Sequence, residues 1–297
     1  MNGLNSVTSG IDVMGKTQSG TVILTAIAMI AFAGNSIICR LALGNELIDP
    51  ASFSTIRLMS GATALYIIIR MRGNSNQRHP GSWISAAMLF LYAVAFSFAY
   101  VSLNAGIGAL ILFGSVQITM ISVGIATGER PHILNWSGLF VALAGLIYLV
   151  LPGLEAPSFL GALLMTTAGL SWGIYSLRGM AIGNPTAVTA DNFLRSAPMA
   201  ILASLCFIIN LNISLKGFFL AFISGALTSG VGYVIWYAAL NHLSATRAAT
   251  VQLLVPVIAA IGGVLLLSEQ ISFRLLFAGI LIIGGVGLTL VHKEISR

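Results

Sequence analysis

The chain has 297 residues, of which 57% are apolar and only 7% are charged, with 14 basic and 8 acidic side chains. A soluble domain carries roughly a quarter charged residues, so this composition excludes a soluble enzyme and a nucleic-acid-binding protein. Residues 79–128 and 217–246 contain no Asp, Glu, Lys or Arg. One bilayer crossing needs about 20 predominantly apolar residues. The sequence therefore predicts an all-α integral membrane protein that crosses the membrane several times.

Along the chain, a polar segment at residues 1–20 is predicted to form a cytoplasmic tail, and apolar runs joined by short connections then follow. We predict ten crossings, at residues 21–42, 51–70, 83–103, 106–126, 134–151, 158–177, 187–209, 217–239, 247–267 and 273–291. The first charge-free stretch is expected to turn at residues 103–108, which contain Asn and Gly. Residues 292–297 are predicted to form a second cytoplasmic tail.

Two parts of the chain share landmarks at a nearly constant separation, which indicates an internal repeat. Arg57 and Arg195 lie inside the second and seventh predicted crossings, 138 residues apart. Glu129 and Glu269 follow the fourth and ninth crossings, 140 residues apart. The chain is therefore predicted to consist of two five-helix halves.

The predicted halves are residues 21–151 and residues 158–291. Because five is an odd number, the second half enters the membrane in the opposite sense, and such inverted repeats are common in secondary transporters. Loop charge then sets the orientation. The loops on the side of the N-terminus hold nine basic residues: Lys16, Arg70, Arg72, Arg78, Arg130, Arg178, Arg247, Lys293 and Arg297. The opposite loops hold only Arg40, Lys216 and Arg274, so both termini are predicted to be cytoplasmic.

Several motifs resemble those of an EamA-type member of the drug/metabolite transporter superfamily. They are Asn35-Ser36-x-x-Cys39-Arg40, Ser54-x-Ile56-Arg57, Gly128-Glu129-Arg130-Pro131 with Gly138, Phe193-Leu-Arg195, and the Pro256 segment that ends in Ser268-Glu269 with Gly279 beyond it. The resemblance implies ten helices in a 5+5 inverted repeat around a central cavity, in the plasma (inner) membrane, and relatives that export amino acids or related metabolites. One departure is Val116, which stands where the first half would match Pro256, so the two helices are expected to kink differently.

Neutral polar and aromatic side chains within the crossings are the candidate substrate-binding groups. They are Asn35, Ser36, Gln117, Trp172, Tyr175, Tyr233, Trp236 and Gln252. Amides in hydrocarbon need hydrogen-bond partners, and aromatic rings with polar tips provide an apolar wall, which together suit a small amphiphile such as an amino acid. Helix packing and interfacial anchoring are the alternative roles. Tyr100 and Tyr237, near segment ends, are predicted to belong to an interfacial aromatic belt.

A second set of residues is predicted to have structural or gating roles. Arg57 and Arg195 lie inside helices, where a charge needs a partner or a path to water. We expect them to snorkel to the interface or to bind backbone carbonyls, with direct contact to substrate as the alternative. Glu129 and Glu269 are expected to pair with a basic neighbour or to cap the following helix. Pro256 is expected to kink its helix and to act as a gate hinge.

The glycines of Gly169-x-x-x-Gly173 are predicted to allow close helix packing. The same stretch, Gly169-Leu-Ser171-Trp-Gly173, also fits the nucleophile-elbow pattern of hydrolases. A catalytic serine needs a base, and the four histidines lie in loops or at helix ends: His79, His132, His242 and His292. We therefore predict that the protein is not an enzyme, and we expect neither a cofactor nor a metal.

The sequence as a whole favours a secondary transporter that exports a small metabolite, such as a neutral or aromatic amino acid, by alternating access. Crossings one and six contain no carboxylate, so proton–cation antiport of the kind used by small multidrug antiporters is not expected. The first alternative is a membrane assembly or partner-binding protein that transports nothing. The more distant alternative is an intramembrane enzyme. The expected partners are a small-molecule substrate and the lipid bilayer, without nucleic acid; the sequence leaves the oligomeric state open, a monomer included.

Overall fold

The computed structural model describes residues 18–71, 81–127, 133–151, 156–180, 182–243 and 245–291. Within these ranges the chain is helical, apart from short turns and one antiparallel bridge between Ile48 and Ile213. The helices are α2 Gln18–Gly44, α3 Pro50–Met71, α4 Trp83–Tyr100, α5 Ala105–Ala126, α6 Ile133–Val150, α7 Phe159–Arg178, α8 Pro185–Leu205, η1 Ile208–Asn210, α9 Leu215–Ile223, η2 Ser224–Val231, α10 Gly232–Leu240, α11 Ala245–Val251, α12 Leu254–Leu267 and α13 Phe273–Val291.

By length and composition, seven helical segments of the described chain can cross a membrane. They are Ser19–Gly44, Pro50–Met71, Trp83–Tyr100, Ala105–Ala126, Phe159–Arg178, Leu215–Leu240 and Arg247–Leu267. The other three predicted crossings coincide with α6, α8 and α13. The apolar stretches of α6 and α13 are shorter, and α8 carries the charged residues Asp191 and Arg195. The all-helical membrane class is confirmed, whereas the count of ten crossings stays a prediction.

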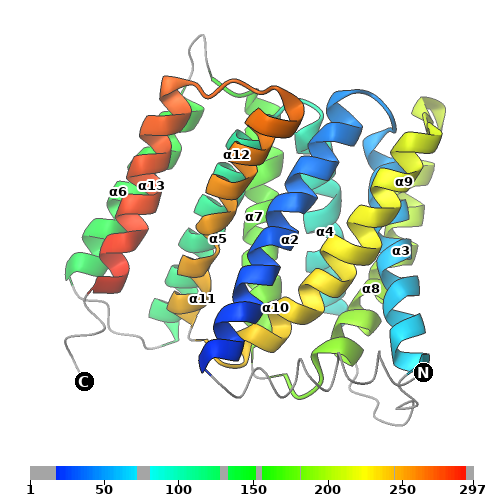
Figure 1. Cartoon of the computed structure of the whole chain (residues 1–297), viewed down its shortest axis with the longest axis horizontal. Helices are drawn as coiled ribbons and strands as arrows, with labels where there is room; N and C mark the ends of the chain where they lie inside the picture. Colours follow the sequence, from blue (N-terminus) through cyan, green and yellow to red (C-terminus); the bar gives the residue numbers. More distant parts are fainter. Residues whose placement is uncertain are drawn as a thin grey trace.

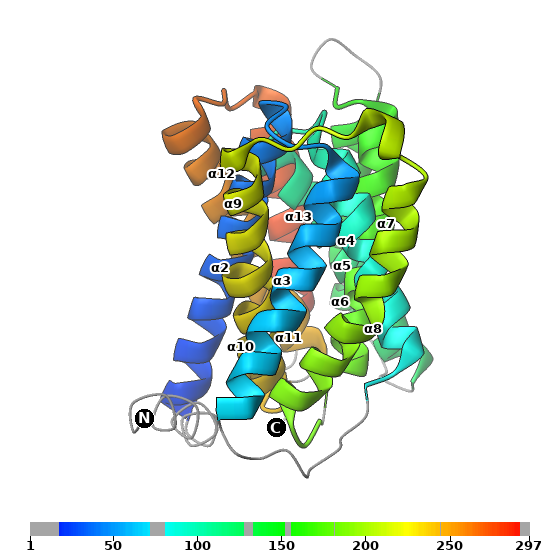
Figure 2. The ribbon, with the colours of Figure 1, turned by 90° about the vertical axis from the view of Figure 1, so that its right-hand side faces the viewer.

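The helices lie side by side and run between two common ends of the molecule, and α2 begins at the end at which α13 finishes (Figure 1). Neighbouring helices come mostly from different predicted halves. Helix α4 packs on α7, α3 on α8, α6 on α13, α5 on α7, and α2 on both α10 and α12. In the view of Figure 2, α3 and α8 lie side by side, as their contacts require. The two predicted halves therefore share one core.

The helix that contains Pro256 is broken, as its sequence predicts. The interruption between α11 and α12 falls at residues 252–253. Proline has no N–H for the carbonyl four residues earlier, which is that of Gln252, and its ring clashes with that carbonyl. Helix α5, which has Val116 at the corresponding position, continues without a break. The predicted break and the difference between the two helices are confirmed, and the kink and its gating role stay predictions.

The paired glycines of α7 bring this helix close to α5. A β-carbon added at Gly169 would lie 2.5 Å from the carbonyl oxygen of Leu112. One added at Gly173 would lie 2.9 Å from the Cβ of Thr119. Because real side chains do not approach this closely, only glycine permits the observed distance between the helices. The predicted packing role of this motif is confirmed.

Candidate functional site

Arg57 lies in the interior of the helix bundle, two turns into α3 and only 1% exposed. Its Nε donates a hydrogen bond to the Ser229 hydroxyl at 2.8 Å. Its Nη2 donates to the hydroxyls of Tyr92 at 3.1 Å and Tyr233 at 2.7 Å. The guanidinium carbon also lies 5.0 Å from the ring centre of Phe96. The prediction that Arg57 snorkels or binds backbone carbonyls is therefore wrong. Its guanidinium instead donates hydrogen bonds to hydroxyls and packs against aromatic rings inside the bundle.

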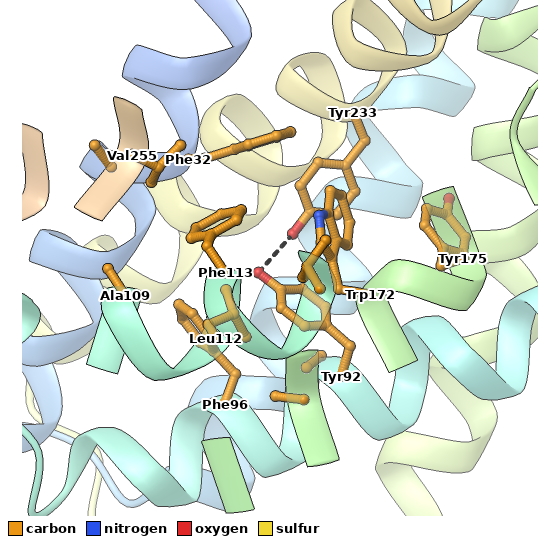
Figure 3. Packing of buried hydrophobic residues seen from close by; sticks show 14 of the residues in the cluster. Phe32, Tyr92, Phe96, Ala109, Leu112, Phe113, Trp172, Tyr175, Tyr233 and Val255 are labelled. Atoms are coloured by element: carbon orange, nitrogen blue, oxygen red, sulfur yellow. Dashed lines mark hydrogen bonds between the residues drawn. The ribbon is translucent and has the colours of Figure 1, made fainter. Parts of the chain in front are cut away.

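Aromatic rings from four helices pack around the Tyr92 and Tyr233 hydroxyls, which accept hydrogen bonds from Arg57. The ring of Trp172 lies 4.6 Å from that of Tyr233, 5.0 Å from Tyr92 and 5.2 Å from Phe32, measured between centroids. Figure 3 shows the hydroxyls of Tyr92 and Tyr233 directed toward each other, at 3.2 Å. We use the term central cluster for Phe32, Arg57, Tyr92, Phe96, Trp172, Ser229 and Tyr233.

Five of the eight predicted substrate-binding residues belong to or contact this central cluster. Trp172 and Tyr233 are members, and the Tyr175 ring stacks on Trp172 at 5.6 Å. The Trp236 ring lies 5.7 Å from Phe32. The indole N–H of Trp172 donates to Oε1 of Gln252 at 2.9 Å. The helix break near Pro256 thus places an amide beside the cluster, because Gln252 lies in the interruption itself.

The other three predicted residues make separate contacts. Gln117 donates from Nε2 to the carbonyl of Ala249, which ties α5 to α11. Asn35 accepts a hydrogen bond from the Ser224 hydroxyl at 2.7 Å. Ser224 opens η2, a π-helical segment, and such segments are rare and often occur at functional sites. Ser36 is fully buried.

Some buried polar atoms of the described residues have no hydrogen-bond partner in the protein. They are Ser36 Oγ, Arg57 Nη1, Gln117 Oε1, Tyr175 OH, Thr189 Oγ1 and Asn192 Nδ2. Buried polar groups are nearly always paired, because an unpaired one loses its hydration without compensation. Four of the six atoms belong to residues that the sequence singled out. Among these atoms, Arg57 Nη1 lies in the central cluster and is a donor that could bind a polar ligand.

Arg195 has a different environment from Arg57, although the two occupy corresponding positions in the predicted repeat. Its Nη2 forms an ion pair with Asp191 at 2.9 Å. The same carboxylate accepts a hydrogen bond from the backbone N–H of Gly81 at 2.5 Å. The Arg195 guanidinium also lies over the ring of Trp83, 5.1 Å from its centre. These contacts connect α8 to the start of α4, away from the central cluster.

Glu269 joins three elements at the opposite end of the bundle. Both carboxylate oxygens accept from the backbone N–H of Ala105, at 3.0 and 2.9 Å, and so cap α5. Arg40 approaches Glu269 at 3.4 Å. The predicted pairing with a basic residue is confirmed, but the capped helix belongs to the first half rather than following Glu269. Its counterpart Glu129 lies outside the described residues.

Tyr100 and Tyr237 do not belong to an interfacial aromatic belt, so that prediction is wrong. Their exposed fractions are 0% and 1%. The Tyr100 hydroxyl donates to the carbonyl of Ala105 at 3.3 Å, and the Tyr237 hydroxyl donates to that of Tyr175 at 3.0 Å. Each hydroxyl finds an acceptor on a neighbouring backbone, so neither needs interfacial water.

Sequence reasoning missed Phe32, Tyr92, Phe96 and Ser229 as members of the site. Tyr92 lies in the middle of a charge-free crossing, and the criterion that selected Tyr233, an aromatic ring with a polar tip inside a crossing, would have found it. Phe32, Phe96 and Ser229 carry no such signal, since phenylalanine and serine recur throughout the apolar segments.

The described residues contain no arrangement suited to hydrolysis. Ser171 is 2% exposed, and His242, the one histidine among the described residues, lies after the end of α10. Within the described ranges no group of three or more His, Cys, Asp or Glu side chains could hold a metal ion.

Together, the apolar spans, the shared helical core and the buried polar cluster define a multi-pass membrane protein with polar groups in its interior. Residues 159–291 match the model of the EamA-like transporter family. A Pseudomonas aeruginosa protein named "Uncharacterized protein PA1977" is 48% identical over 92% of this chain and 95% of its own length. The chain belongs to the EamA-like transporter family, as its motifs predict. It is a membrane transporter and not an enzyme.

More distant relatives agree with this assignment. The "Probable amino-acid metabolite efflux pump" of Escherichia coli is 24% identical over 89% of this chain and 92% of its own length. The "Uncharacterized transporter YoaV" of Bacillus subtilis is 24% identical over 80% of this chain and 86% of its own length. A solved protein crystal structure superposes with a TM-score of 0.64 at 17% identity, covering 92% of this chain and 98% of that one, and supports the fold alone.

Proposed function

We propose that this transporter is a secondary carrier that exports a small metabolite by alternating access around the central cluster. The observation that carries the proposal is a buried donor without a protein partner, Arg57 Nη1, which lies among aromatic rings in the central cluster. A substrate reaches this donor only when helices move apart. A site that opens by helix movement is what a carrier requires.

The helix contacts support a 5+5 inverted repeat with ten crossings and halves at residues 21–151 and 158–291. Exchange of the two halves replaces α2 by α7, α4 by α10, and α5 by α12. The contact of α4 with α7 then becomes that of α10 with α2, and the contact of α5 with α7 becomes that of α12 with α2. Both members of each pair occur. The contacts of α3 with α8 and of α6 with α13 map onto themselves.

The chemistry of the site favours a small polar substrate with an apolar part, such as a neutral or aromatic amino acid. Indole, phenol and phenyl rings form the walls. Hydroxyl, amide and guanidinium groups supply the polar contacts. The Escherichia coli relative, named as a probable amino-acid metabolite efflux pump, points to the same class of compound.

The proposal is tested by transport in proteoliposomes. The purified protein is reconstituted with labelled amino acids trapped inside, and efflux is compared with that from protein-free liposomes. We expect at least one neutral amino acid to leave faster, and to exchange with the same compound added outside. A partner-binding protein without transport activity predicts no difference for any compound, and that result would refute the proposal.

Both termini are expected to be cytoplasmic, in the inner membrane, because nine basic residues lie in the loops on that side against three in the opposite loops. Reporter fusions to either end should therefore show activity only if the reporter works in the cytoplasm. A fusion in the connection that precedes α9 and Lys216 provides the control for the opposite side. Activity of a periplasmic reporter at either terminus contradicts this orientation.

Transport is expected to follow the substrate gradient without a proton gradient. The carboxylates of Asp191 and Glu269 are held by Arg195 and Arg40, outside the central cluster. Arg57 stays charged at every physiological pH, and no histidine of the described residues belongs to the cluster. Efflux should be measured at a fixed substrate gradient, with and without an imposed pH difference. Uphill transport that appears only with the pH difference contradicts the prediction and makes Asp191, Glu269 and Glu129 the candidates for a proton carrier.

A further inference from the structure

Arg57 is a buried cation without a counter-ion among the described residues. The carboxylates of Glu269 and Asp191 pair with Arg40 and Arg195, and not with Arg57. The titratable side chains that act on Arg57 are those of Tyr92, Tyr233 and Cys39, and none of them is a carboxylate. Burying a charge without an opposite charge is costly, and polar groups offset only part of that cost. No carboxylate of the described residues therefore balances the positive charge of Arg57.

The contacts that Arg57 does make leave one part of its guanidinium free. Nε and Nη2 donate to three hydroxyls, and two ring faces lie against the planar group. Nη1 has no partner, although the residue is 1% exposed. Nη1 carries two N–H groups, and charged donors of this kind form short, strong hydrogen bonds with a carboxylate. A ligand carboxylate would accept hydrogen bonds from Nη1 and would also supply the missing negative charge.

The neighbouring residues fit an anionic head attached to an apolar body. The phenol of Tyr233 both accepts from Arg57 and lies 3.2 Å from the phenol of Tyr92, so these hydroxyls can reorient to donate to an anion. The ring of Trp172 lies 4.6 Å from the Tyr233 ring and offers an apolar surface beside them. A cation without a carboxylate would instead meet the charge of Arg57 and be repelled.

We propose that Arg57 binds the carboxylate of the transported metabolite through Nη1, so that the substrate supplies the counter-ion that the protein lacks. This proposal rests on the proposed carrier function and names its substrate class: small carboxylates, with or without an amino group, and not amines. It also gives Arg57 and Arg195 separate roles. Arg195 already has Asp191 as its counter-ion, so it is a structural residue and no anion is needed there.

The first experiment uses the unaltered protein and compounds that differ only at the carboxylate. The amino acid that proteoliposomes release fastest is compared with its carboxamide and with its decarboxylated amine. Loss of a charge-assisted hydrogen-bonded contact weakens binding by about 10- to 100-fold, so both analogues should compete for transport that much less well. Equal competition by the carboxamide overturns the proposal while leaving the carrier function intact. Absence of transport for every compound overturns both.

The second experiment assigns the preference to Arg57. The ratio of acid to carboxamide competition is measured for Arg57→Gln and Arg57→Lys, each first shown to elute as a single folded species in detergent. We expect Arg57→Gln to abolish the preference and Arg57→Lys, which keeps the charge, to restore part of it. Arg195→Gln is the matched control, and its folded fraction should keep the ratio of the unaltered protein. A folded Arg57→Gln that still prefers the acid overturns the proposal, and the first experiment decides alone if this variant does not fold.

Discussion

Replacing Trp172 with alanine is expected to destabilise the protein by about 3–5 kcal/mol and to slow transport by the remaining folded fraction about 10-fold or more. The indole contacts the rings of Phe32, Tyr92 and Tyr233, so its removal leaves a cavity between four helices. It also leaves Oε1 of Gln252 without the donor that it now has at 2.9 Å. Thermal unfolding in detergent and efflux per folded molecule measure the two effects.

Two further variants separate these effects. Trp172→Phe keeps a ring in the cluster but removes the indole N–H, so it should lose less stability than the alanine variant and still transport more slowly than the unaltered protein. Trp136→Ala is the matched control, because Trp136 on α6 is 40% exposed and its ring stacks on Phe140 outside the central cluster. If Trp172→Ala unfolds and transports like the unaltered protein, the central cluster is not the substrate site.

Adding one methyl group is expected to lower the stability of the protein at one glycine and not at another. Gly169→Ala should destabilise the protein by about 1–3 kcal/mol, because the new Cβ would lie 2.5 Å from the backbone oxygen of Leu112, which cannot move aside as a flexible side chain would. Gly279→Ala on α13 should not destabilise it, since no atom lies within 4 Å of the added Cβ and alanine favours the helix by about 1 kcal/mol.

The midpoint of thermal unfolding in the same detergent compares the two glycine variants directly. A fall for Gly169→Ala and no fall for Gly279→Ala is the expected pair of results. Equal midpoints would mean that α7 and α5 are farther apart than the structure shows. Because Gly169 lies one turn before Trp172 on α7, the close approach of α7 to α5 also helps to place the indole in the central cluster. Gly169→Ala should therefore slow transport as well.

The positions of individual residues show where sequence reasoning succeeds. The break before Pro256 and the unbroken α5 at Val116 follow from covalent chemistry, since only proline lacks the backbone N–H. The packing of Gly169 and Gly173 follows from size. Both effects depend on the residue and its immediate neighbours along the helix. Such local properties can be read before any helix is placed beside another.

Arg57 shows where sequence reasoning stops. Its position inside a helix indicated that it needs partners, but its partners Tyr92, Ser229 and Tyr233 are 35, 172 and 176 residues away along the chain. For an arginine two turns from a helix end, snorkelling to interfacial water was expected because it costs less free energy than burying the charge. That expectation was wrong because three other helices bring hydroxyl groups to the same point, and those hydroxyls replace water.

The sequence by itself determined that this protein is an all-helical membrane protein, because apolar runs in a bilayer must satisfy their backbone hydrogen bonds within each segment. Its resemblance to the EamA-type family implied a transporter. The sequence also determined where one of those helices breaks. Only the tertiary structure decided that Arg57 and Trp172 belong to one cluster with Gln252 beside it. It also decided that Arg195 pairs with Asp191 outside that cluster and that Glu269 caps a helix of the other predicted half. The physical reason is that these helices are apolar around most of their circumference. Apolar periodicity then does not indicate which face meets which neighbour, and close packing with the pairing of the few buried polar groups selects the arrangement.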